Sequence, residues 1–519
     1  MLASIGTYAI YGATAILCFS VGVNEIVLFA STLHGTRTCA WKVIVLLGVC
    51  SVVRSVWLLH GYSVPSYTSA LDIFEIDAAQ EPQLRLLGMA ALACAVVTSV
   101  AGLLLALPTA LMPAFHACVL GFLLQRAPPG PGVLGDLGLL YVGVPGVAAL
   151  GAWLVARVLA GRQQEEAQQG NQFNRTLRWC TVVYPLTVTV IGGTVLFRQV
   201  PGLLPASVPA RAAPLVAAGL STALCLGAVL FTRTFLTAWL KRRVFLLYPQ
   251  ECAQYLKTTE RAHEARDREA RGLGPGTRAA PALGTALGTG LARSGSSRAS
   301  TLPLGADGQA ALNARRSEEL FRPALVLIAL FVQASTVNGE CLLVLAVLQR
   351  VFNGPVPAFS PHVFLGVACV AMAAGRLTLS RRVAETVGAR IIVRMRPSQA
   401  FAAMLGVLLA LVSGRVLGFH AELGLGVLVT CLVAALAAVG GASLTRALDV
   451  DAAGVCSPAP SPSYAYSTES LAVTEHAPRL RIFRHTLLRI GAYWGVVLLG
   501  SLAVGLLVGR LGETWTAAP

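Results

Sequence analysis

Residues 5–31 form the stretch IGTYAIYGATAILCFSVGVNEIVLFAS, an apolar run that carries Asn24 and Glu25 in its second half. At the rise of an α-helix, about 20 apolar residues cross the hydrocarbon core of a bilayer, so Glu25 is predicted at membrane depth or near the membrane edge. A charge placed there costs at least about 2.5 kcal/mol and usually faces a bundle interior or a water-filled cavity. The run therefore predicts a membrane-spanning helix whose acid has a specific partner or task.

The composition extends this prediction to the whole chain. Of its 519 residues, 55% are hydrophobic and only 12% are charged, whereas soluble proteins are about 25% charged. Apolar runs of similar length recur, which predicts an all-α integral membrane protein, a polytopic bundle of 11 to 12 transmembrane helices surrounded by the lipid bilayer. No motif for a metal, a cofactor or enzyme chemistry is present, so we expect neither a cofactor nor an enzyme.

The net charge of +16 does not indicate a nucleic-acid partner. Lys and Arg concentrate between the apolar runs, which is the pattern that the positive-inside rule gives to cytoplasmic loops. We therefore expect no nucleic-acid binding and a multi-pass protein of the plasma membrane or an endomembrane. The predicted organisation is an N-terminal transmembrane half (1–240), a cytoplasmic basic low-complexity linker (241–322), and a C-terminal transmembrane half (323–519) with a polar Ser-Pro loop (449–484).

The linker contains serines beside arginines, a context that suits kinases, and Ser297, Ser300 and Ser317 are the phosphorylation candidates. Phosphate there would reduce the positive charge facing an anionic leaflet. The linker is also predicted to recruit cytoplasmic protein partners, because low-complexity sequence of this kind cannot bury a core of its own.

The number of spans depends on residues 84–125, an apolar stretch interrupted by Pro108 and Pro113. If this stretch forms two short spans joined by a tight hairpin, the chain has 12 spans and both termini lie outside the cytoplasm. If it crosses once, the count is 11 and the termini differ. The distribution of Lys and Arg favours 12, because the basic connections then share one side.

A second copy of the Asn/Glu pair occurs late in the chain, as Asn338 and Glu340 within the apolar run 323–352. Two related halves would place such polar residues together near the midplane, which is the usual construction of secondary transporters. A chance match between apolar runs is the alternative. The candidate residues for a solute or a coupling ion are Asn24, Glu25, Arg54, Gln333, Asn338 and Glu340.

Each of these candidates has a structural alternative. A desolvated carboxylate can exchange a proton or hold a cation, but Glu25 could equally form a structural pair with Arg54 of the following span. Gln333 lies two helical turns before Glu340 and so shares its face, where it could act only as polar contact between helices.

The segment from Gly375 to Arg390 loosely resembles the basic, glycine-containing cytoplasmic loop of major facilitator transporters, through Gly375, Arg376, Arg381 and Arg382. The long central linker and the span count are likewise similar to that family and to equilibrative nucleoside transporters. The acidic residue of the segment is not where the family's aspartate would lie. Stop-transfer arginines followed by a short amphipathic helix are the alternative interpretation.

Together these patterns predict a multi-pass transporter of a small solute, proton- or cation-coupled through Glu25 and Glu340 with Arg54 as counter-charge. The alternative is a non-transporting polytopic protein, such as a receptor-like protein, a scaffold or a protein of viral origin, whose intramembrane charges are structural.

Charge-removing variants separate the two roles of the acids. If Glu25 and Glu340 couple transport, Glu25→Gln and Glu340→Gln should leave expression intact and abolish or uncouple uptake, because the exchangeable charge is lost. If Glu25 only pairs with Arg54, each single variant should misfold, and Glu25→Leu combined with Arg54→Leu should restore part of the folded yield.

Overall fold

The computed structural model describes residues 2–36, 38–61, 81–109, 111–126, 131–169, 179–197, 209, 212–231, 234, 306–336, 361–386, 395–416, 430–438 and 470–516. Over these ranges the regular structure is entirely helical, which confirms the all-α fold class. In chain order the elements are α1 (Leu2–Gly35), α2 (Trp41–Gly61), α4 (Glu81–Leu105), α5 (Leu111–Arg126), α6 (Pro131–Gly138), the π-helix η3 (Leu139–Gly143), α7 (Val144–Gln169), the π-helix η4 (Trp179–Val183), α9 (Tyr184–Phe197), α10 (Ala213–Phe231), α13 (Ala306–Thr336), α15 (Pro361–Thr378), α16 (Ser380–Glu385), α17 (Pro397–Val416) and α20 (Ser470–Thr516). Residues 430–438 form a further short helix.

The helices have the length and the surface of membrane spans. Among the described residues, three stretches are long and apolar enough to cross a bilayer, namely Leu86–Leu105, Pro131–Arg162 and Leu488–Leu511, and shorter apolar helices accompany them. Large apolar side chains point outward from these stretches; Leu104 is 82% exposed and Val496 is 72% exposed. Such a surface is stable only against lipid, as expected for a polytopic membrane protein.

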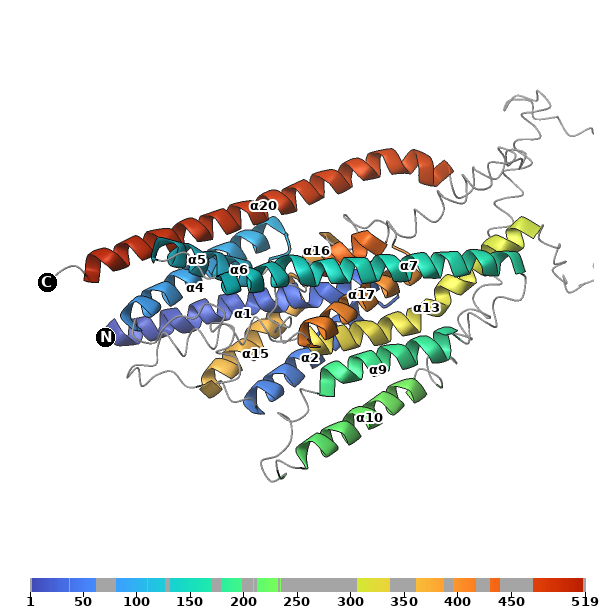
Figure 1. Ribbon diagram of the computed structural model, residues 1–519, viewed down its shortest axis with the longest axis horizontal. Helices are drawn as coiled ribbons and strands as arrows, with labels where there is room; N and C mark the ends of the chain where they lie inside the picture. The colour runs from blue at the N-terminus through green and yellow to red at the C-terminus, as the bar shows by residue number, and fades with distance from the viewer. Residues whose placement is uncertain are drawn as a thin grey trace, which may run out of the picture.

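The longest helices run side by side along the length of the molecule (Figure 1). The N-terminal end of α1 and the C-terminal end of α20 lie at the left of the view, whereas α7 ends and α13 and α20 begin at the right. The basic residues 479–489 lie in the first half of α20. The first residues of α1 and the last residues of α20 thus lie at the same end of the view.

Two helices extend beyond the predicted spans. The structure begins α13 at Ala306, inside the segment predicted as linker, and α20 at Ser470, inside the segment predicted as a polar loop. Hydropathy marks only the part of a helix that lies in lipid, while backbone hydrogen bonding continues into the polar region. The polar turns of α13 are paired: Glu318 accepts hydrogen bonds from Ser398 N (3.0 Å) and Oγ (2.8 Å), at the start of α17.

Glycines let helices of the two predicted halves touch backbone to backbone. A Cβ on Gly375 of α15 would collide with the carbonyl oxygen of Phe19 in α1, and one on Gly406 of α17 would collide with that of Ala148 in α7. Gly505 of α20 meets α5 in the same way. Small residues at such crossings are typical of membrane helices, which gain stability from close van der Waals contact rather than from the hydrophobic effect. Each crossing joins a helix before residue 240 to one after residue 323.

The α1–α15 crossing can be tested with two alanine variants of one helix. Gly375→Ala adds a methyl group against the backbone of α1 and should lower the free energy of unfolding by about 1–3 kcal/mol, the usual cost of overpacking. Gly366→Ala, also in α15, has open space at its Cβ. Thermal unfolding in detergent should show a loss for the first variant and none for the second; equal stabilities would contradict the close contact.

Candidate functional site

The chain leaves the helical conformation between α4 and α5, where the prolines predicted a hairpin. At the end of α4, Ala106 N donates to Leu103 O (3.2 Å) and Leu107 N donates to Gly102 O (2.9 Å), the hydrogen bonds of a Schellman motif. Ala106 takes the left-handed conformation that this motif requires, with φ of 52°. Pro108 follows, and α5 begins at Leu111. Residues Ala106–Thr109 therefore form a break at the centre of a membrane hairpin.

A polar cluster from α1 holds this break. Asn24 Oδ1 accepts a hydrogen bond from Thr109 N (2.9 Å), and Asn24 Nδ2 donates to Thr109 Oγ1 (2.5 Å) and Ser20 O (2.9 Å). The hydroxyls of Ser20 and Thr109 lie 3.3 Å apart. Asn24, Ser20 and Thr109, which we call the Asn24 cluster, are at most 5% exposed. The cluster satisfies the backbone N–H of Thr109, which lies between the two helices and needs a partner within the protein.

The start of α5 gives this place the chemistry of an anion site. The first turn of a helix presents N–H groups and the positive end of the helix dipole, equivalent to about half an elementary charge. Pro113 falls in that first turn, where its missing N–H costs no intrahelical bond. The hydroxyl and amide groups of the Asn24 cluster lie beside it as neutral donors. Broken helices at membrane depth bind anionic groups of substrates in this manner.

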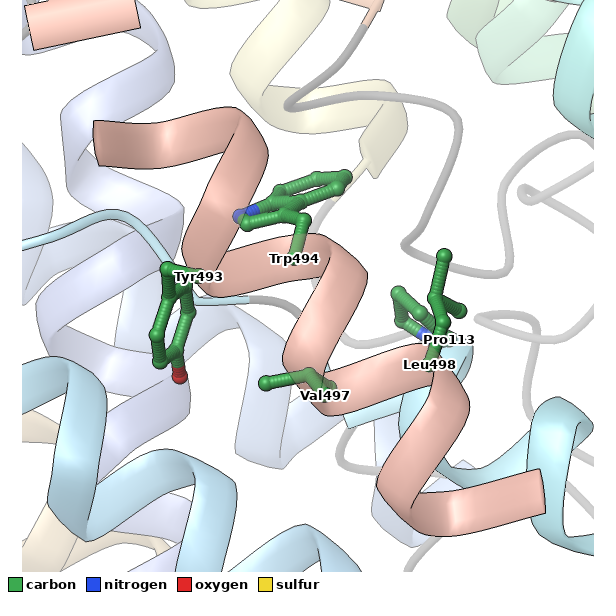
Figure 2. Close-up of a pocket in the computed structure, with 5 residues that line it drawn as sticks. All are labelled: Pro113, Tyr493, Trp494, Val497 and Leu498. Atoms are coloured by element: carbon green, nitrogen blue, oxygen red, sulfur yellow. The ribbon is translucent and has the colours of Figure 1, made fainter. Parts of the chain in front are cut away.

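A small pocket lies against the same turn. Its lining residues are Pro113 of α5 and Tyr493, Trp494, Val497 and Leu498 of α20 (Figure 2). The pocket is small and mostly apolar, and Pro113 lines it from the first turn of α5.

The structure places two of the six predicted solute or ion residues with their side chains. Asn24 belongs to the cluster, and Gln333 is buried on α13, a helix that packs against α1. Glu25 and Arg54 are in α1 and α2, but their side chains lie outside the described set, as do Asn338 and Glu340 altogether. Ser20 and Thr109 were not predicted. Their signals were the four-residue spacing of Ser20 from Asn24 and the threonine directly after Pro108.

The predicted cytoplasmic loop is wrong for two of its four residues. Gly375 and Arg376 belong to α15, and the Arg376 guanidinium is fully buried and donates a hydrogen bond from Nη1 to Gly48 O of α2. A buried arginine pairs with other charges or with backbone carbonyls, and the Gly48 carbonyl oxygen is such an acceptor.

Arg381 and Arg382 are exposed on α16, where Arg381 pairs with Glu385 at 2.8 Å while Val383 and Ala384 are buried. This part is the short amphipathic helix of the alternative interpretation. Among the phosphorylation candidates, Ser317 is in α13, whereas Ser297 and Ser300 lie outside the described residues.

Comparison with known proteins gives one family and one solved structure of interest. A family model described as the phosphate transporter family matches residues 21–505. A solved structure described as "The sodium-dependent phosphate transporter" has a TM-score of 0.58 to this chain at 13% identity, over 99% of this chain and all of the other. No curated protein matches the chain.

The Asn24 cluster predicts a graded mutational series. Asn24→Ala leaves the Thr109 amide without its acceptor and should lower the free energy of unfolding by about 1–3 kcal/mol. Ser20→Ala removes only the 3.3 Å hydroxyl contacts and keeps the Ser20 carbonyl, so its effect should be much smaller. Hydrogen exchange at Thr109 should rise in the first variant alone; unchanged protection in Asn24→Ala would contradict the arrangement.

Proposed function

Since the chain belongs to the phosphate transporter family, we propose that it carries inorganic phosphate, bound where α5 begins beside the Asn24 cluster. The observation that supports this site is the hydrogen bonding of Asn24 to a chain break inside the membrane. Phosphate bound there would replace the Asn24–Thr109 hydrogen bonds with bonds to its own oxygens, and the first turn of α5 would stabilise its charge.

Membership of this family decides several of the predictions from sequence. The prediction of a multi-pass membrane transporter of a small solute, rather than an enzyme, is confirmed. The resemblance to major facilitator and equilibrative nucleoside transporters pointed correctly to a transporter but to the wrong family. The feature that carried it, the arginines after α15, belongs to helical structure that packs on α1 and α2.

Coupling to a cation remains part of the proposal. Phosphate carries one to two negative charges near neutral pH, and a co-transported cation would offset the cost of bringing that charge into the membrane. The similar solved structure is described as sodium-dependent, and carboxylate oxygens suit a hard cation. Glu25, the residue after Asn24, and Glu340 are the proposed coupling carboxylates, with Arg54, Gln333 and Asn338 as the proposed neighbours.

Three further assignments rest on sequence and stay proposals. The basic ends of the helices are proposed to face the cytoplasm, with both termini on the other side, in the plasma membrane or an endomembrane. The segment 241–322 is proposed to recruit cytoplasmic protein partners through its basic sequence. Phosphorylation of Ser297, Ser300 and Ser317 is proposed to regulate this recruitment.

Transport by the purified full chain in liposomes tests the proposal. An inward sodium gradient should drive labelled phosphate into the liposomes, and uptake should be slower when potassium replaces sodium. Uptake should also be lower with Asn24→Ala than with Ser20→Ala, because only Asn24 contacts the Thr109 amide. An inward proton gradient without sodium is the second arm, and sulfate is the control solute. Folded, monodisperse protein that carries no phosphate under any of these gradients would overturn the assignment.

A further inference from the structure

Two neighbouring aromatic residues of α20 reach across to the α4–α5 hairpin. Tyr493 Oη donates a hydrogen bond to Thr98 O in α4 (2.6 Å), and Trp494 Nε1 donates to Pro108 O in the break (3.2 Å). Figure 2 shows the two rings leaving α20 on different sides of the helix. One residue thus contacts the helix before the break and the next contacts the break itself.

Gly102 makes this approach feasible. A Cβ at this position would lie 2.8 Å from Tyr493 Oη and would collide with the methyl group of Thr109. The missing side chain at Gly102 therefore leaves room for Thr109 and Tyr493 to pack against the backbone of α4. Any side chain at Gly102 would displace both Thr109 and Tyr493.

Two different helices form hydrogen bonds with adjacent residues of the break. Asn24 binds Thr109 from α1, and Trp494 binds the preceding residue, Pro108, from α20. Among the described residues, Trp494 also packs against two of the three groups of buried apolar residues, one around α7, α13 and α17 and one between α4, α5 and α20. Further along α20, Gly505 fixes α5 by direct backbone contact. The small pocket that Pro113 lines lies beside Trp494, between these two contacts.

Interhelical hydrogen bonds in membranes are individually weak, so bonds of this kind can form and break within a transport cycle. A backbone carbonyl in lipid needs a partner, however, and Pro108 O cannot be released without a replacement. Both requirements fit a hydrogen bond from Trp494 to Pro108 O that forms in one conformation of the break and is replaced by another hydrogen bond when the conformation changes.

We propose that Tyr493 and Trp494 are positioning residues for transport: through Thr98 O and Pro108 O they hold the α4–α5 break in the geometry that binds the anion. The proposal rests on the proposed function for its effect on transport, but the position of the break can be measured without any solute.

The experiment compares the full chain in lipid nanodiscs with Trp494→Phe, Tyr493→Phe and the control Val497→Ala. Tyr493→Phe keeps its ring and loses only the hydroxyl donor, whereas Trp494→Phe loses the indole N–H together with part of the side-chain volume. Val497→Ala also removes volume from the same pocket without touching a hydrogen bond, so it controls for the loss of volume. Hydrogen exchange of residues 103–112 should become about three- to tenfold faster in the two aromatic variants, in line with the loss of one interhelical hydrogen bond. It should stay unchanged in the control.

Uptake in liposomes gives the second reading. Trp494→Phe should raise the KM for phosphate several-fold with little change in the maximal rate per folded molecule, because the site is loosened rather than lost. A merely destabilised protein would lose maximal rate at constant KM. Unchanged exchange in both aromatic variants, or an equal increase in Val497→Ala, would overturn the proposal. Faster exchange in a chain whose wild type carries no phosphate would support the role of the two aromatics at the break and reject the phosphate assignment.

Discussion

A chain that leaves the helical conformation inside a membrane must find partners within the protein for its N–H and C=O groups, because lipid supplies none. The segment Ala106–Thr109 is under that constraint. Two of its N–H groups donate hydrogen bonds to carbonyl oxygens in the last turn of α4, where Ala106 takes the left-handed conformation. The segment then depends on distant helices: Asn24 of α1 binds the Thr109 amide and Trp494 of α20 binds the Pro108 carbonyl. The packing of α1 and α20 beside the break is therefore what satisfies these two backbone groups.

Glycines make this arrangement possible by bringing helices into backbone contact. Gly375 sets α15 against α1, Gly406 sets α17 against α7, and Gly505 sets α20 against α5. Each crossing joins an early helix to a late one, so the two parts of the chain pack directly against each other. A transporter needs such mechanical connection if a small anion is to bias the arrangement of whole helices.

Much of the fold could be predicted from composition and periodicity. The apolar run 5–31 lies within α1, and Pro108 with Pro113 located the hairpin between α4 and α5. These successes share a cause, since hydropathy and proline chemistry act locally. The polar first turns of α13 and α20 were missed because a helix does not end where lipid ends.

The candidate site could be predicted only in part, for a related reason. Asn24 stood out because an amide within an apolar run needs a partner, but which partner is set by packing between helices that sequence order does not bring together. Thr109 lies 85 residues away along the chain. Arg376 was misplaced because a cation after a span usually marks the membrane edge, whereas here the Gly48 carbonyl accepts its hydrogen bond inside the bundle.

The measurement that tests the account most directly is a cryo-EM structure of the full chain in nanodiscs with phosphate. The account predicts density for the anion within hydrogen-bonding distance of Asn24 Nδ2 and the first turn of α5. Density bound elsewhere, with the Asn24–Thr109 hydrogen bonds intact, would contradict it.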